Sequence, residues 1–301
     1  MVRFDDGPSS NFEDRTGSPG GGLGFGGGGG SNLLGCLLPM VMSRFGIGGV
    51  LILLLGYCAL TQLGGGGGGG LLPSGPSTTT NAPAGQSTLA AEDRRILVGA
   101  LESTDQVWGQ IFQRSGASYT EPTLVAYTRG TQTACGMGQA AMGPFYCPND
   151  QKIYIDPDFF NELSRRFQAP GDFAAAYVIA HEVGHHVQNL EGTLDEAQRA
   201  QQSLGKAEGN RVQVGVELQA DCYAGVWAAN ARTAQGQPIL EPGDVEEGMR
   251  AAEAIGDDML QKQSQGVVVP ESFTHGSSAQ RMQALRTGLE TGNPASCKFN
   301  R

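Results

Sequence analysis

The chain has 301 residues, of which 47 are glycine, and its formal net charge is −10 at pH 7. Because an acidic domain is repelled by polyanions, this charge argues against nucleic acid or an anionic membrane surface as a partner. None of the six cysteines forms a C-x-x-C pair, which disfavours a cysteine zinc ribbon.

The first 88 residues differ in composition from the rest of the chain. Residues 1–44 contain GSPGGGLGFGGGGG and little that could pack, so we expect them to be disordered. Residues 45–63, FGIGGVLILLLGYCALTQL, carry no charge, and a helix of this length roughly matches a ~30 Å hydrocarbon core. Residues 64–88 begin with GGGGGGG, continue with a Pro/Ser/Thr run, and are predicted to be a linker.

We interpret residues 45–63 as a transmembrane helix. A cleaved signal peptide is disfavoured by the 44 residues before the segment, and a lipoprotein site at Cys58 is disfavoured by the bulky Tyr57 that precedes it. A buried core helix is the remaining alternative. Arg44 stands at the N-terminal edge and no charge follows the span until Glu92. The positive-inside tendency therefore predicts a single-pass protein of the cell membrane, with a cytoplasmic N-terminus and an extracytoplasmic domain.

Residues 89–301 have an ordinary composition, and we expect them to form one α+β domain, mostly helical with a small sheet. Apolar spacing and capping residues predict helices at about residues 89–115, 157–167, 172–192, 210–234, 244–263 and 277–292. Short apolar runs predict strands at 123–128 and 152–157.

Four cysteines lie in this domain. An oxidising exterior would let Cys135 and Cys147 pair, and by loop entropy such a bridge contributes about 3 kcal/mol. Cys222 and Cys297 remain as a second candidate pair. The alternative is that the four are buried free thiols.

The segment AYVIAHEVGHHVQNL, residues 176–190, holds three of the four histidines of the chain. On a helix, His181 and His185 share a face, so both imidazoles can bind one zinc ion. Glu182 lies about 100° further round the helix, where it can reach a water molecule but not easily the ion. This is the H-E-x-x-H pattern of two ligands and a general base. For His186, which points to a different face, we expect a supporting or structural role.

A hydrolytic zinc site needs a third protein ligand, and VGVELQADCYAG, residues 214–225, contains two acidic residues four positions apart. Burial of carboxylates in this apolar stretch is costly unless each has a partner. We predict Glu217 as the ligand and Asp221 as the acceptor of the other ring N–H of a ligand histidine. The swapped assignment, and an amphipathic helix whose acids face water, are the alternatives.

The fourth histidine, His275, precedes the helix predicted at residues 277–292. From such a loop its imidazole can donate to the oxyanion of a tetrahedral intermediate, which makes it a candidate catalytic residue. A histidine bonded to a nearby carbonyl at the helix entry is the alternative. Arg281 can bind a carboxylate such as Asp221, or a substrate group, with two hydrogen bonds.

The motifs HEVGHHVQNL and ELQADCYAG resemble those of the neutral zinc metallopeptidase family of bacteria, which are single-span membrane proteins. The likeness extends to ACGMGQAAMGPFYCPNDQKIYID (134–156) and to THGSSAQR (274–281), and covers most of residues 89–301. More distantly, the pattern is similar to that of the thermolysin-like gluzincins. The resemblance implies a zincin-like fold, zinc on His181, His185 and Glu217, and Glu182 as the catalytic acid and base. One departure is the spacer of 31 residues between His185 and Glu217, which is longer than in thermolysin.

Together these features predict a membrane-anchored, zinc-dependent endopeptidase that acts on a protein or peptide substrate with one Zn²⁺ per chain. The rival hypothesis is a non-catalytic, membrane-tethered scaffold with a structural zinc ion. In such a site His186 or another residue would fill the fourth coordination position and leave no room for water.

Overall fold

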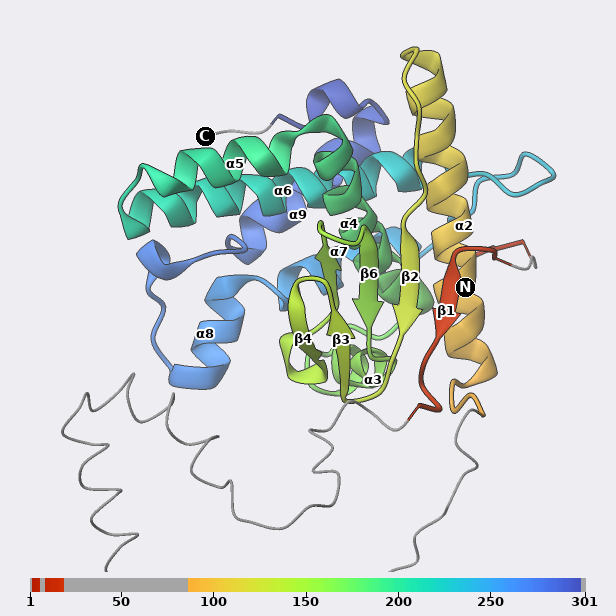
Figure 1. Cartoon of the computed structure of the whole chain (residues 1–301), viewed down its shortest axis with the longest axis horizontal. Helices are drawn as coiled ribbons and strands as arrows, with labels where there is room; N and C mark the ends of the chain where they lie inside the picture. Colours follow the sequence, from red (N-terminus) through yellow and green to blue (C-terminus); the bar gives the residue numbers. More distant parts are fainter. Residues whose placement is uncertain (1, 6–8, 19–85, 299–301) are drawn as a thin grey trace, which may run out of the picture. The chain divides into compact units, whose positions relative to one another are not determined.

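Helices account for most of the domain in a computed structural model of the chain, which describes residues 2–5, 9–18 and 86–298 (Figure 1). The long helices are α2 (Ala91–Arg114), α4 (Asp172–Glu191), α6 (Lys206–Asn230) and α9 (Ser278–Thr291). Shorter helices connect them, namely α3 (Asp158–Arg165), α5 (Thr193–Gln202), α7 (Asp244–Ala254) and α8 (Asp257–Gln265). All the described residues belong to one compact unit.

The strands form a small sheet of mixed direction beside the helices (Figure 1). Its order is β1 (Phe12–Asp14), β2 (Thr123–Ala126), β6 (Lys152–Ile155) and β5 (Phe145–Cys147). The first three strands are mutually parallel and β5 is antiparallel to β6, which leaves β5 at one edge. A separate hairpin pairs β3 (Gly130–Thr133) with β4 (Gly136–Gln139).

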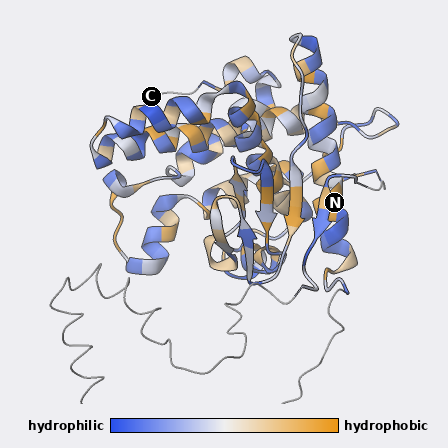
Figure 2. Ribbon diagram, viewed as in Figure 1, coloured by the Kyte–Doolittle hydropathy of each residue, from blue (hydrophilic) through white to orange (hydrophobic). Residues whose placement is uncertain are grey.

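The core lies around α4, which contacts α2, α6 and α7. Its first turns bury alanines and aromatic rings, and Phe173 stacks on Trp227 of α6 with 5.9 Å between ring centroids. Hydrophilic and hydrophobic residues alternate along α2, as expected of a helix with one face in the core (Figure 2). Burial of this apolar surface is the main source of stability that fixes α4 in place.

A close crossing of α6 and α9 brings the C-terminal helix against the centre of the domain. A Cβ atom on Gly225 would lie 2.2 Å from the carbonyl oxygen of Leu285, and one on Gly288 would lie 2.0 Å from that of Cys222. Both positions therefore require glycine. The crossing carries Arg281, near the start of α9, to a buried position beside α6.

Both candidate cysteine pairs form disulfides. Cys135 pairs with Cys147 and links the turn before β4 to β5. Cys222 pairs with Cys297 and ties α6 to the segment after α9, across 75 residues of sequence. The prediction of a disulfide framework in the domain is confirmed.

The prediction of disorder over residues 1–44 is wrong for the part that the structure describes. β1 pairs with β2, and Val2 is buried in the core. Lys152 of β6 forms an ion pair with Glu13, which anchors the strand. Residues 86–88 of the predicted linker are also engaged, since the backbone N–H of Thr88 donates to the hydroxyl of Thr16 at 3.0 Å. The domain therefore includes N-terminal residues and does not begin at residue 89.

The predicted fold also needs correction in its membrane part. Of the helices formed by residues 86–298, none has both the length and the run of apolar residues needed to cross a bilayer. The long ones carry ionisable groups in their interiors, such as Glu182 in α4 and Asp221 in α6. The predicted span at residues 45–63 lies outside the described residues. The structure is one of mixed helix and sheet, and it does not support the predicted single-pass membrane location.

Candidate active site

Two neighbouring helices bring the predicted metal ligands together. α4 presents His181 and His185 on one face, with 4.7 Å between their ring centroids. Glu217 of α6 places its Oε2 atom 3.3 Å from Nε2 of His181 and 3.6 Å from Nε2 of His185. The helices approach closely because residue 184 is glycine: a Cβ atom there would lie 3.0 Å from Cα of Ala220. One ligand atom from each of the three side chains lies within 4.8 Å of the others.

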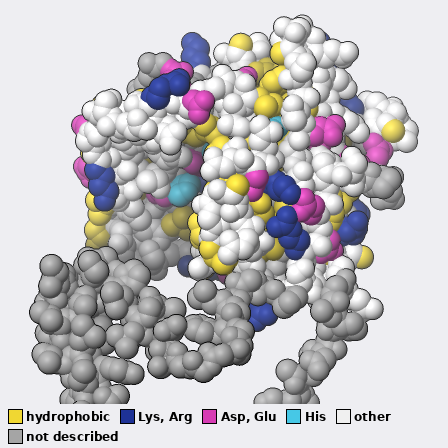
Figure 3. All heavy atoms as spheres, viewed as in Figure 1, with side chains coloured by type: hydrophobic (Ala, Val, Ile, Leu, Met, Phe, Trp, Pro, Cys, Tyr) yellow, Lys and Arg dark blue, Asp and Glu magenta, His cyan; other side chains and the backbone are white. Residues whose placement is uncertain are grey.

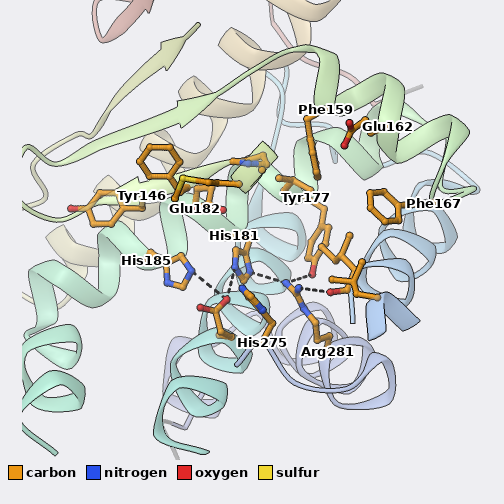
Figure 4. Close-up of a pocket in the computed structure, with 18 of the residues that line it drawn as sticks. Tyr146, Phe159, Glu162, Phe167, Tyr177, His181, Glu182, His185, His275 and Arg281 are labelled. Atoms are coloured by element: carbon orange, nitrogen blue, oxygen red, sulfur yellow. Dashed lines mark hydrogen bonds and ion pairs between the residues drawn. The ribbon is translucent and has the colours of Figure 1, made fainter. Parts of the chain in front are cut away.

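The second ring nitrogen of His181 is held by a buried carboxylate. Its Nδ1 lies 2.8 Å from Oδ1 of Asp221, which also accepts a hydrogen bond from the Tyr177 hydroxyl at 2.6 Å. Arg281 donates to both oxygens of Asp221, from Nε at 2.9 Å and from Nη2 at 2.8 Å. Figure 4 shows Arg281 and His275 approaching His181 from the side opposite Tyr146 and Glu182. Asp221 therefore orients His181 and is itself neutralised by Arg281.

These contacts set the protonation of the group. Burial alone would lower the pKa of His181, but the Asp221 carboxylate outweighs this effect and raises the pKa to about 9. Burial alone would raise the pKa of Asp221, but Arg281 and His181 hold it at about 2. The pKa of Glu217 is held well below its usual range, because His185 and His181 overcome the effect of burial.

The second ring nitrogen of His185 is held by an amide chain. Nδ1 lies 2.9 Å from Oε1 of Gln188, and the amide nitrogen of Gln188 donates to Oε1 of Gln219 at 2.9 Å and to the carbonyl of Val216 at 2.7 Å. Gln219 in turn donates to the carbonyl of Cys297 at 2.9 Å. Because the Val216 carbonyl and Gln219 Oε1 are acceptors, they fix the nitrogen end of the Gln188 amide, and Oε1 of Gln188 faces His185. His185 therefore carries a proton on Nδ1 and turns Nε2 toward Glu217.

Glu182 is buried beside the ligand pair but stands apart from it. Glu182 is 6 % exposed, and among the described residues no hydrogen-bond donor contacts its carboxylate. Burial raises the pKa of Glu182, while the nearby rings of His185 and His181 oppose the shift. A carboxylate in this position can accept a proton from a group that enters the cleft.

His275 enters the cleft from the loop before α9. The carboxylate of Asp257, at the start of α8, accepts the backbone N–H groups of Thr274, His275 and Gly276 at 2.7, 2.7 and 3.1 Å. Its other oxygen lies 3.2 Å from Nδ1 of His275, and this hydrogen bond raises the pKa of the imidazole. Asp257 thus stabilises the loop and orients the imidazole ring of His275.

His186 faces away from the ligand pair and is fully buried. Its Nε2 donates to the carbonyl of Thr120 at 2.5 Å, and its Nδ1 lies 3.0 Å from the hydroxyl of Tyr146. Burial lowers its pKa, so the ring is neutral and accepts the Tyr146 proton. With both nitrogens engaged, His186 has a structural position and lies in the wall behind β5.

The ligand group opens into a cleft of about 420 Å³. A histidine side chain lies in a hollow of the molecular surface, next to hydrophobic side chains (Figure 3). One part of the wall is apolar and comes from the residues around β5, α3 and α8, namely Met142, Phe145, Phe159, Phe167 and Leu260. The carboxylate of Glu182 and the ring of His275 also line the cleft.

The donor set fits a zinc ion. Zinc in proteins takes imidazole nitrogen and carboxylate oxygen, and each ligand histidine has its second nitrogen fixed by an acceptor, as bound histidines usually do. Among the described residues the cluster supplies three ligands. A second acidic cluster, formed by Asp172, Asp244 and Glu247, lacks histidine.

The structure brings together all the residues predicted for the site: His181, Glu182, His185, Glu217, Asp221, His275 and Arg281. It also shows four supporting residues that the sequence analysis did not predict: Tyr177, Gln188, Gln213 and Asp257. Tyr177 and Gln213 each stand four residues before a ligand on the same helix face, so spacing could have suggested them. For Asp257, which is 18 residues from His275, no local signal exists.

Comparison with known proteins also connects the chain with zinc peptidases. The sequence model of a family described as "Putative neutral zinc metallopeptidase" matches residues 3–299. The chain is 52% identical over 197 residues to the "Uncharacterized protein YpfJ" of Escherichia coli (strain K12), covering 65% of this chain and 68% of the relative. It is 44% identical over 209 residues to the "Uncharacterized protein Rv2575" of Mycobacterium tuberculosis (strain ATCC 25618 / H37Rv), covering 67% and 68%. No solved structure matches the chain.

Proposed function

The chain belongs to the neutral zinc metallopeptidase family, and on that premise we propose that it hydrolyses peptide bonds with zinc held by His181, His185 and Glu217. The observation that carries the proposal is the convergence of these three ligand atoms at the floor of a cleft, with the carboxylate of Glu182 beside them. A zinc ion there would act as a Lewis acid that polarises the scissile carbonyl and makes a water molecule more acidic.

The residues of the chain then have distinct tasks. Glu182 accepts the proton of the attacking water on its carboxylate and delivers it to the leaving amine. His275, whose ring Asp257 holds in place and whose pKa this hydrogen bond raises, donates from its ring to the oxyanion that forms on the substrate carbonyl. Asp221 fixes the orientation of His181, and the apolar cleft wall binds a substrate side chain and excludes water.

The rival hypothesis of a closed, structural zinc site has less support. It requires a fourth protein ligand, and His186, the histidine nearest in sequence, is occupied by Thr120 and Tyr146. Within residues 86–298 the ligand group has three members and faces a cleft. A buried Glu182 with a raised pKa would serve no purpose in such a site.

Removal of the metal is expected to abolish cleavage. Full-length protein should cleave an unfolded protein such as casein in the presence of zinc. Treatment with a chelator should reduce the cleavage rate to the background rate measured without protein, and added zinc should restore it. The rate is followed by the release of fluorescent peptides. Cleavage that persists after the chelator has removed the zinc, as shown by metal analysis, would contradict the proposal.

Zinc affinity is expected to rise with pH up to about pH 9. The proton and the ion compete for Nε2 of His181, and Asp221 raises the pKa of this ring to about 9, so the proton is present at neutral pH. Higher pH removes the competitor, and affinity should increase by about tenfold per pH unit for each proton displaced. Competition with a chromogenic chelator at pH 6, 7, 8 and 9 measures this. An affinity that is constant between pH 7 and 9 would rule out the raised pKa.

A further inference from the structure

The spacer between His185 and Glu217 contains α5, which the chemistry above does not use. α5 packs against α6 and walls a second hollow of about 550 Å³. This hollow and the cleft share two lining residues, Tyr146 of β5 and the ligand His185. The two depressions therefore adjoin each other at the metal ligand His185.

The two depressions differ in chemistry. One wall of the cleft is made of aromatic and aliphatic side chains. By contrast, five of the twelve residues that line the hollow are amides: Asn149, Asn189, Gln198, Gln201 and Gln213. Among the lining residues of the hollow, all of them within the described part of the chain, Asp195 is the only one with a formal charge. A side chain that hydrogen bonds, and above all a cation, would be favoured there.

The polar side chains of α5 are placed to receive a ligand. Asp195 and Gln198 are three residues apart on one helix face, and both residues are exposed. Within the described residues, neither side chain makes a hydrogen bond to the protein. They are therefore free to bind a partner that enters the hollow.

α5 is also coupled to the metal centre. The Gln201 amide donates to Oε1 of Gln213 at 3.1 Å, and Gln213 donates to Oε1 of the ligand Glu217 at 3.0 Å. This chain of hydrogen bonds sets the distance of α5 from the ligand group. A residue bound against α5 would consequently have a fixed position relative to the scissile bond.

We propose that α5 builds a second substrate half-site, so that an extended polypeptide crosses the metal centre with an apolar side chain in the cleft and a polar or basic side chain in the hollow. This inference rests on the proposed function. It specifies the substrate as an internal stretch of polypeptide in which these two kinds of residue flank the cleaved bond.

The test is peptide binding to full-length, zinc-loaded protein carrying Glu182→Gln, which is measured by fluorescence anisotropy and needs no turnover. Each peptide places Phe on one side of a central bond and Lys, Gln, Leu or Glu on the other, and both orders are synthesised. In one of the two orders, the peptides with Lys or Gln should bind about five-fold more tightly than the peptide with Glu. When Asp195→Lys is introduced as a second substitution, the protein should prefer the peptides with Glu to those with Lys, and the requirement for Phe should remain. Glu208→Lys, an equal change of charge at an exposed residue outside the hollow, is the matched control and should keep the original preference.

The outcomes separate the two proposals. If Asp195→Lys keeps the original preference, if Glu208→Lys reverses it equally, or if no peptide binds, the half-site is overturned. If the peptides bind in the expected order but wild-type protein with zinc does not cleave them, the half-site stands and the peptidase function fails. If wild-type protein cleaves them but Lys and Glu bind equally well, the function stands and the half-site fails.

Discussion

Replacement of Glu182 by Gln is expected to lower kcat for peptide cleavage by about 10³-fold while zinc stays bound. The amide has nearly the same shape but cannot accept the proton of the attacking water, and general base catalysis contributes about 10² to 10⁴-fold. Zinc should remain because the carboxylate of Glu182 is not one of the three groups that converge within 4.8 Å. Steady-state kinetics with a fluorogenic peptide and metal analysis of the same sample measure both quantities.

Glu290→Gln provides the matched control. It makes the same chemical change at an exposed residue of α9 that does not line the cleft. Its kcat should stay within about twofold of wild type, as is usual for surface substitutions that touch nothing in the site. Equal activity of the Glu182→Gln and wild-type proteins would refute the assignment of Glu182 as the base.

Replacement of Arg281 by Leu is expected to destabilise the domain by about 3–5 kcal/mol, the usual cost of leaving a buried charge without its partner. Arg281 is 3 % exposed and Asp221 is fully buried, so water cannot take over the role of the guanidinium. The loss should also weaken zinc binding at neutral pH, because Arg281 is a cation that opposes protonation of His181. Urea unfolding and chelator competition measure the two effects.

Two further variants test whether the loss of the ion pair explains the destabilisation. Arg286→Leu removes an exposed arginine from the same helix and should change stability by less than about 0.5 kcal/mol. The double variant Arg281→Leu/Asp221→Leu removes both charges and should be more stable than Arg281→Leu alone, since no unpaired charge remains. A double variant as unstable as the sum of the two single changes would show that packing, and not the ion pair, explains the loss.

Much of the site could be predicted because it depends on local spacing. The four-residue interval between His181 and His185 and that between Glu217 and Asp221 each fix two side chains on one helix face. The capping box of Ser277 and Gln280, with which α9 begins, likewise depends on local spacing. Local spacing could not predict that α4 packs against α6, and the only indication of this contact in α4 is the small residue Gly184.

Several elements were missed because their sequence signals are weak. The strands β3, β4 and β5 have three or four residues each, and β3 and β4 contain glycine, so their periodicity is weak. α5 has few apolar residues and was not predicted for the same reason. The helix predicted over residues 244–263 is in fact two helices, α7 and α8. The chain breaks at Ile255 and Gly256, and Asp257 at the start of α8 accepts the backbone N–H groups of residues 274–276.

The hydrogen bonds between Thr16 and Thr88 have a practical consequence. The Thr88 hydroxyl also donates to the carbonyl of Thr16, at 3.2 Å, and the Ser87 hydroxyl donates to Asp14. These contacts hold the described residues on either side of positions 19–85 against each other. A gene in which a short Gly/Ser bridge joins Ser18 to Gln86 would retain β1 and every residue of the candidate active site. Deletion of everything before residue 89 would instead strip β1 from the sheet and bare the edge of β2 to unwanted pairing.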